Sequence, residues 1–427
     1  MRGGHAASYR YRARRHRGIE QATGALLVAM TLAVATAPAQ AQTVSRDPTL
    51  DALPRPGYEA RPIRLGAWVI EPTLETRAWF NDNIRASPEG KRSDGVLTVS
   101  PRVDVRRIRG MNALRLDAHA ALLRYARTPR ENVDTFGAQA YMRQTIGSAH
   151  ALEATAAYDR IFEQRFDPEA DVALARRPAL IDATRGEFQY RYVGARVGAG
   201  VTLGVNRFDY RASEDRDRDL MTYSIAVRGF VAVSPRTSLF VQPYANWREP
   251  STLLDRSGVQ RETFTSGALA GLALDLTDRI QGEMGLGVFR ADPADPSLKA
   301  FTGIAANGRL TWHPRTRTLV SLAVFRGDVA TIRIGAIGRI DGTVDLRVEQ
   351  EARHNLLVHA TAGFRSISYR GLSAQDQRYF RTSIGARYLV NRQVSVGVEG
   401  GYLNRGASDP LRRFDRWTGA LAVRSIL

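Results

Sequence analysis

Apolar and polar residues alternate with a period of two along most of this chain. In one such run Leu97, Val99, Val103 and Val105 alternate with polar or charged residues. Successive side chains of a β-strand point to opposite faces, so this pattern predicts a strand with one apolar and one polar face. An amphipathic helix would need apolar residues three and four positions apart, which this run lacks. The same alternation recurs at 114–122, 332–348 and 356–365.

The connections between these runs alternate in length. Short turns rich in Pro, Asp and Asn lie at 234–237, 277–279, 313–316 and 391–393. Longer polar stretches lie at 81–94, 163–184, 211–219, 249–260, 291–300 and 370–377. Short turns at one end and long loops at the other are typical of outer-membrane barrels.

About eighteen strands fit this pattern, and both chain ends then fall on the short-turn side. The expected strands start near residues 65, 95, 112, 133, 149, 185, 197, 220, 238, 261, 280, 301, 317, 332, 355, 378, 394 and 413. Sixteen strands also fit, because the Gly-rich stretch around 183–210 leaves the register there open.

Run length separates a barrel from a soluble β-sandwich. Sandwich strands average about five or six residues, whereas many runs here are long enough to cross a membrane at a tilt. In hydrocarbon every backbone N–H and C=O group must be paired, and only a closed sheet has no edge. We therefore expect an all-β fold, a closed antiparallel transmembrane β-barrel formed by residues 65–427.

The composition excludes several other classes. The chain of 427 residues has no Cys, which excludes a disulfide scaffold and a Cys-based zinc site. It has no apolar run long enough for a transmembrane helix. The net charge of +18 comes from Arg, since Lys91 and Lys299 are the only lysines. Such a bias is typical of a GC-rich genome, and we do not expect a nucleic-acid partner.

The first 41 residues predict a secretory signal peptide. A basic stretch ends at Arg17, an apolar run follows from 22 to 37, and Ala39 and Ala41 form the small-x-small cleavage pattern. Residues 42–64 are then expected to form a short periplasmic segment that precedes the barrel. This order predicts export to the outer membrane of a Gram-negative cell.

Aromatic residues are expected at the lipid-facing strand ends, where they form girdles at the membrane interfaces. Those beside long loops are Phe80, Phe136, Tyr158, Phe188, Tyr223, Trp247, Phe264, Phe380, Tyr402 and Trp417. Trp312 lies next to a short turn. The alternative is that aromatic residues simply favour strands.

Short motifs add a family resemblance. They are Trp79–Ile84 with Ser93-Asp94 and Val99–Pro101, Phe166–Asp171 with Arg177-Pro178, and Val233–Thr237. Together they resemble the beta-barrel porin type 2 family of proteobacterial outer membranes, and the resemblance spans nearly all of the mature chain. It implies an outer-membrane barrel without an established substrate, and some members belong to exopolysaccharide settings.

A barrel of 16 to 18 strands is wide enough to hold water. The alternation places the following residues in its lumen: Arg102, Arg106, Arg115, Asp117, His119, Arg143, Arg228, Arg248, Arg309, Arg333, Arg339, Arg347, His359, Arg365, Arg381 and Arg387. Further acids on this face are Glu71, Glu75, Asp104, Glu153, Asp341, Asp345 and Glu399. An excess of Arg would favour anions, or the charges pair across strands and make the wall rigid.

The sequence therefore predicts a porin-like passive diffusion channel for small solutes, with anions as the candidate class. The alternative is a structural or polysaccharide-export-associated barrel without general pore activity. A hydrolase is the remote alternative, because Asp117 and His119 could form a dyad, but no G-x-S-x-G motif accompanies them.

We expect no enzyme activity, no cofactor and no metal site. The expected partners are outer-membrane lipid, lipopolysaccharide and the barrel-insertion machinery, and the oligomeric state stays open.

Overall fold

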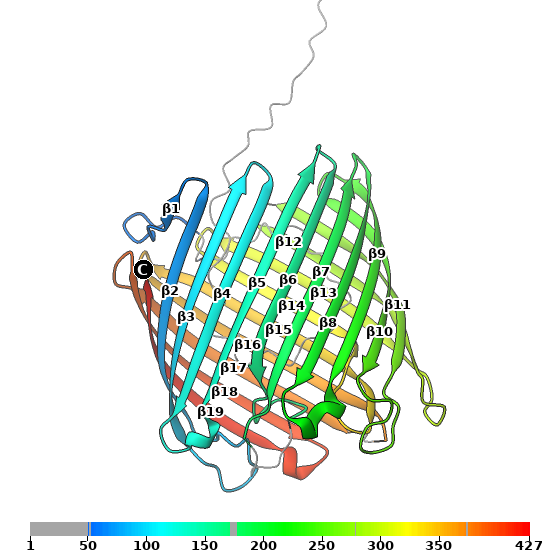
Figure 1. Ribbon diagram of the computed structural model, residues 1–427. Helices are drawn as coiled ribbons and strands as arrows, with labels where there is room; N and C mark the ends of the chain where they lie inside the picture. Colours follow the sequence, from blue (N-terminus) through cyan, green and yellow to red (C-terminus); the bar gives the residue numbers. More distant parts are fainter. Residues whose placement is uncertain (1–49, 51–52, 171–176, 278, 373–374) are drawn as a thin grey trace, which may run out of the picture.

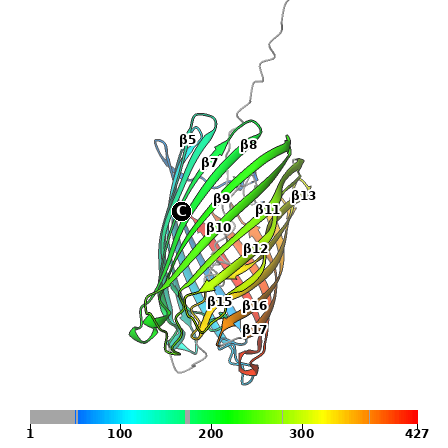
Figure 2. The same cartoon turned by 90° about the vertical axis from the view of Figure 1, so that its right-hand side faces the viewer.

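The computed structural model describes residue 50 and residues 53–170, 177–277, 279–372 and 375–427. Within these ranges eighteen long antiparallel strands, β2 to β19, follow one another around a barrel (Figure 1). The barrel is wider in Figure 1 than in Figure 2, which is turned by 90°, so its cross-section is oval. We call the end with the short connections the turn end and the opposite end the loop end.

The strand bounds follow the alternation of the sequence closely. The strands are β2 Trp68–Asn81, β3 Asp94–Arg109, β4 Asn112–Tyr125, β5 Val133–Ile146, β6 His150–Phe162, β7 Leu180–Val193, β8 Val197–Tyr210, β9 Leu220–Ser234, β10 Thr237–Pro250, β11 Thr263–Thr277, β12 Ile280–Pro293, β13 Phe301–Arg315, β14 Thr318–Val329, β15 Ala336–Arg353, β16 Leu356–Gly371, β17 Asp376–Leu389, β18 Val394–Ala407 and β19 Phe414–Ile426. Short 3-10 helices in the loops are η3 Pro129–Glu131, η4 Ser213–Arg218 and η5 Pro410–Arg412.

The barrel closes between its first and last long strands. β19 pairs antiparallel with β2, from Thr418 opposite Asn81 to Ile426 opposite Thr73. A short strand, β1 (Ile63–Leu65), pairs with the first residues of β2, beyond the part that β19 covers. Closure removes the long sheet edges that a bilayer could not hydrogen-bond. The expected fold class is confirmed, with 18 strands.

Most strands begin within two or three residues of their expected starts, and two differ more. β7 begins at Leu180 rather than near 185, and β15 begins at Ala336 rather than near 332. Residues 330–335 form the loop before β15, and Gly335 has a positive φ of 76° there. Arg333, which the alternation places on a strand, therefore lies in this loop.

The outward face of the wall is apolar. Leu286 on β12, Ile304 on β13 and Ile384 on β17 are 59%, 61% and 69% exposed, although their side chains are large and aliphatic. Large contiguous apolar surface is rare on soluble monomers. On a barrel it forms the band that meets lipid.

The expected interfacial aromatics are at least partly exposed, and several meet across neighbouring strands. The ring centroids of Trp247 and Phe264 are 5.0 Å apart, and those of Tyr402 and Trp417 are 4.6 Å apart. Phe188 differs from the expectation, because β7 begins five residues earlier than predicted. It is the ninth of the 14 residues of β7 and does not lie beside the long loop.

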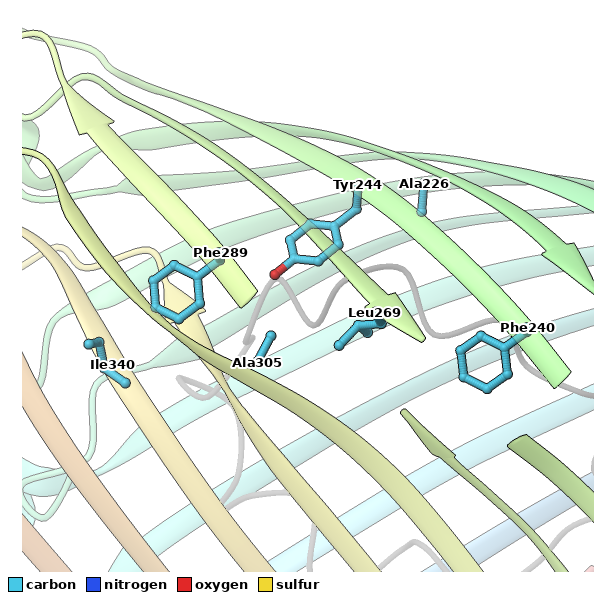
Figure 3. Packing of buried hydrophobic residues seen from close by; sticks show 7 residues of the cluster. All are labelled: Ala226, Phe240, Tyr244, Leu269, Phe289, Ala305 and Ile340. Atoms are coloured by element: carbon cyan, nitrogen blue, oxygen red, sulfur yellow. The ribbon is translucent and has the colours of Figure 1, made fainter. Parts of the chain in front are cut away.

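At the loop end, β14 separates from β13, and the hairpin of β14 and β15 bends into the barrel while β15 stays paired with β16. β13 begins at Phe301, but its pairing with β14 begins only at Ala306. Ile340 of β15 joins a cluster of buried side chains that includes the inward-facing Phe240 and Phe289, and it lies on the Phe289 side of this cluster in Figure 3. We call residues 327–341 the infolded hairpin, because they lie inside the ring of strands.

In the described part of the chain, no helix is long and apolar enough to cross a membrane.

A charge on the lipid face should destabilise the barrel. Leu286 lies at the middle of β12, so we expect Leu286→Arg to lower the free energy of unfolding in lipid vesicles by about 2–4 kcal/mol. Leu254→Arg, in the loop after β10 and also exposed, is the matched control and should cost little. Denaturant titrations followed by Trp fluorescence measure both variants. Equal costs for the two would contradict the assignment of the outward face.

Candidate functional site: the barrel lumen

Charged residues on the inward strand faces form ion pairs, nearly all of them between different strands. Arg102 Nε lies 2.5 Å from Asp117 Oδ2, and Arg228 Nη1 lies 2.7 Å from Glu283 Oε1. Arg381 Nη2 lies 2.6 Å from Asp345 Oδ1. Further pairs are Arg77–Glu399, Arg106–Glu71, Arg115–Asp104, Arg143–Glu153, Arg347–Glu349 and Arg365–Asp341. Each pair satisfies charges that face the interior. Pairs such as Arg102–Asp117 join neighbouring strands, whereas Arg381–Asp345 and Arg228–Glu283 join strands two and three positions apart.

The residues predicted to line the lumen fall into three groups in the structure. Arg309, Arg365 and Arg381 border the main lumenal cavity. Arg248 pairs with Asp328 of the infolded hairpin, and Arg333 and Arg339 belong to this hairpin. The others belong to the inward faces of their strands, away from the cavity: Arg102, Arg106, Arg115, Asp117, His119, Arg143, Arg228, Arg347, His359 and Arg387.

The loop between β6 and β7 crosses the lumen. We call residues 163–170 the strap. β6 and β15 are nine strands apart in either direction around the ring, so they lie on opposite walls. The Glu169 carboxylate at the end of the strap lies 3.0 Å from Nη1 of Arg339 on β15. Arg339 belongs to the infolded hairpin, and the strap also contacts Tyr369 of β16 and Gln377 of β17, eight and seven strands away from β6, so the loop crosses the lumen.

Four more strands of the far wall hold the strap. Tyr369 of β16 and Gln377 of β17 both donate to the carbonyl oxygen of Pro168, at 3.2 and 3.4 Å. Arg405 of β18 donates to the carbonyl oxygen of Asp167 at 3.4 Å. The Arg416 guanidinium of β19 stacks 3.6 Å from the ring centre of Phe166. The strap is thus fixed by charge-assisted and aromatic contacts rather than by sheet pairing.

The infolded hairpin fills the lumen beside the strap. Thr331 Oγ1 donates to Glu169, which joins the hairpin loop to the strap. Arg248 of β10 pairs with Asp328 at 2.5 Å, and both side chains are almost completely buried. Thr265 Oγ1 donates to the same carboxylate oxygen at 2.6 Å. The strap and the hairpin together obstruct the lumen towards the loop end.

A cavity of about 720 Å³ remains between the strap and the wall. Its lining includes residues of β2, β7, β13 and β15 to β19, so it lies inside the ring of strands. Seven arginines and eight carboxylates border it, and their charges nearly balance. The aromatic side chains of Trp79, Phe325 and Tyr379 are also part of the lining.

The N-terminal segment reaches the turn-end mouth of the lumen. Leu50 and Leu53 pack against Leu319 and Leu357, which face inward at the turn ends of β14 and β16. Arg55 Nε lies 3.3 Å from a Glu351 carboxylate oxygen, and both side chains are buried. This part of the expected periplasmic segment is therefore attached to the barrel. The predicted signal peptide and its cleavage residues, Ala39 and Ala41, lie outside the described residues.

His119 lies between two carboxylates. Its Nδ1 is 3.2 Å from Asp117 Oδ1, and its Nε2 is 3.3 Å from Asp159 Oδ1. A catalytic His of the hydrolase type faces a carboxylate with one nitrogen and a nucleophile with the other. Here carboxylates face both nitrogens, an arrangement that supports a wall contact rather than a dyad. In the described part of the chain, no group of three His, Asp or Glu residues could hold a metal ion.

The closed 18-strand wall agrees with a family match. Residues 55–425 match the family described as "Putative beta-barrel porin 2". The chain belongs to this family. Together with the closed barrel, this membership places the chain among the porin-like barrels of the Gram-negative outer membrane. No protein of curated function matches the chain.

The chain also resembles several solved structures at low sequence identity. The FrpB iron transporter of Neisseria meningitidis (F3-3 variant) has a TM-score of 0.43 and 10% identity, over 78% of this chain and 62% of that chain. OpdL of Pseudomonas aeruginosa has a TM-score of 0.42 and 12% identity, over 85% of this chain and 99% of that chain. The siderophore receptor PirA of Acinetobacter baumannii has a TM-score of 0.43 and 7% identity, over 84% of this chain and 80% of that chain. This chain thus spans less than two thirds of the first of these structures, and the likeness concerns the fold alone.

Sequence reasoning missed the residues that hold the strap. Glu169 and Asp167 belong to the Phe166–Asp171 motif, which carries part of the family resemblance, but alternation says nothing about where a loop goes. Tyr369 and Arg405 lie on inward strand faces, and nothing in their local sequence marks them as its partners. The length of the polar stretch that begins at residue 163 was the one available signal, because long structured loops are often functional.

The carboxyl group of Asp167 makes the attachment of the strap inside the lumen depend on pH. Burial raises the pKa of Asp167 to about 7, with Glu163 contributing in the same direction and Arg365 and Arg416 opposing. The docked strap therefore holds a proton that the undocked strap releases, since an exposed Asp titrates near 3.9. The stabilising effect is complete below about pH 4 and is lost as the pH rises towards 7.

We therefore expect the strap to open more often as the pH rises from about 5 to 7, by up to about tenfold per unit. In this Cys-free chain, Ala170→Cys reports strap opening through its rate of maleimide labelling. Leu254→Cys in an exposed loop corrects for the ionisation of the thiol. The ratio of the two rates should rise with pH, and Asp167→Asn should make it flat. A ratio that falls with pH would contradict this assignment.

Proposed function

We propose that this barrel is a narrow diffusion channel for small hydrophilic solutes. The observation that carries the proposal is the charged cavity of about 720 Å³ between the strap and the wall. A lumen filled only for structural reasons would be lined by packed apolar side chains, as in small barrels. Fifteen charged side chains around one cavity instead favour water and polar solutes.

The charge distribution supports a weak preference for anions. Within the cavity, arginines and carboxylates nearly balance, and several form pairs such as Arg77–Glu399. Paired charges give little net field along the pathway. The turn-end mouth, in contrast, carries exposed arginines on most of its turns, which would attract anions at one entrance.

The strap sets the width of the pathway in this proposal. It crosses the lumen from β6 to β15 and leaves the cavity to one side. Solutes then pass through the cavity on the side of the strap that has no contact with the wall. The channel should therefore conduct less than an unobstructed barrel of 18 strands.

Planar-bilayer recordings test the pore and its selectivity together. Refolded protein should give small, discrete conductance steps, and the reversal potential in a salt gradient should indicate a slight preference for anions over cations. The absence of steps would favour the alternative function, a structural or export-associated barrel. A reversal potential that indicates cation preference would contradict the proposed selectivity.

Release of the strap should widen the channel. Arg339→Gln removes the charged partner of the buried Glu169, and an unpaired buried charge typically costs about 3–5 kcal/mol. The strap then leaves its site, and the single-channel conductance should rise. Arg228→Gln is the matched control, because it breaks a wall pair with Glu283 that does not touch the strap. Equal conductance in the two variants would show that the strap does not limit flow.

A further inference from the structure

The turn end of the barrel carries a ring of exposed arginines. Among the described residues, seven of the eight turns carry at least one in the turn or next to it. The arginine ring consists of Arg107, Arg109, Arg196, Arg236, Arg279, Arg315, Arg353 and Arg392. Exposed acidic side chains in the described part of this end are Glu59 and Asp275. The arginine ring is therefore strongly positive.

The loop end has a different charge pattern. There, exposed carboxylates are more numerous: they include Glu89, Asp134, Glu214, Glu249, Glu262 and Asp376. Some loop-end arginines pair with carboxylates, as in Arg290–Asp292 at 2.9 Å and Arg256–Asp217 at 2.6 Å. Such pairs neutralise the arginines locally. The difference between the ends shows that the arginine ring is not a uniform consequence of the Arg-rich composition.

Exposed apolar side chains lie beside arginines of the arginine ring. Val233, three residues before Arg236, is 58% exposed, and Val197 next to Arg196 is 57% exposed. The Arg107 guanidinium also stacks 5.6 Å from the ring centre of Trp68, at the edge of the lipid-facing band. Arginine with neighbouring apolar and aromatic side chains is the combination that suits the headgroup region of a bilayer. A surface that binds an acidic protein needs the arginines but not exposed apolar side chains next to the lipid-facing band.

We propose that the arginine ring binds the headgroups of anionic phospholipids in the leaflet that surrounds the turn end. Guanidinium groups form paired hydrogen bonds with phosphate oxygens. Basic residues at a bilayer surface attract anionic lipids, and this attraction decreases within one Debye length. Lipid binding of this kind is independent of whether the lumen conducts.

Tryptophan quenching by brominated lipids tests the proposal at the correct end. Trp68 and Trp312 lie on β2 and β13 near the turn end, so they report the lipids there. Trp79, Trp247 and Trp417 are replaced by Phe to remove other signals. The full mature chain is reconstituted in phosphatidylcholine vesicles that contain brominated phosphatidylglycerol or brominated phosphatidylcholine. The binding constant of phosphatidylglycerol relative to phosphatidylcholine should be about threefold or more, and should fall in 0.5 M salt.

Matched variants identify the residues responsible. Arg109→Gln, Arg196→Gln and Arg315→Gln together remove three charges from the arginine ring, and the relative binding constant should fall towards one. Arg92→Gln, Arg130→Gln and Arg370→Gln remove three exposed charges from the loop end and should leave it unchanged. The shift in gel migration on heating verifies that each variant is folded.

Two results would overturn the proposal. One is a binding constant of phosphatidylglycerol relative to phosphatidylcholine that is near one in the protein that keeps all its arginines. This result would leave an acidic protein as the candidate partner. The other is an equal decrease in both triple variants, which would indicate a general effect of net charge. The measurement on the protein that keeps all its arginines tests the proposal even if the turn-end variant does not fold.

Discussion

The need to pair every backbone hydrogen-bonding group in hydrocarbon determines the rest of this structure. A sheet in lipid cannot leave an edge open, so β19 must return to β2. Once the sheet is closed, alternate side chains have only two environments. The outward set meets lipid and is aliphatic or aromatic, and the inward set encloses a volume too wide for side chains alone to fill.

That interior volume explains both the charge pairs and the strap. Arginines on inward faces lie within the barrel, and carboxylates of other strands such as Asp117 and Asp345 pair with them. The strap and the infolded hairpin occupy the part of the lumen that the wall leaves open. Glu169 contacts Arg339 and Thr331 and so joins the strap to the infolded hairpin. The cavity is the space that these two segments do not occupy.

The division between what the sequence predicts and what it does not follows from the range of each interaction. The period of two is local, so the strands, their faces and the lipid-facing residues follow from alternation, and most strand starts are predicted closely. The path of a loop depends on contacts with residues more than 150 positions away, such as Glu169 with Thr331, and no local pattern encodes it. The misplacement of Arg333 has the same origin. Alternation continues through residues 332–335, but Gly335 turns the chain, and the strand begins only at Ala336.

The most direct test of this account is a cross-link at the seam of the barrel. Ala78 on β2 lies opposite Leu421 on β19, and both face outward. Directly opposite positions in an antiparallel pair are close enough for a disulfide. The chain has no Cys of its own, so Ala78→Cys with Leu421→Cys should form an intramolecular disulfide in the folded protein, visible as a reductant-sensitive shift in gel migration. Ala78→Cys with Leu346→Cys, on β15, should not form one. Failure of the first pair, or equal linking of the second, would contradict a barrel closed between β2 and β19.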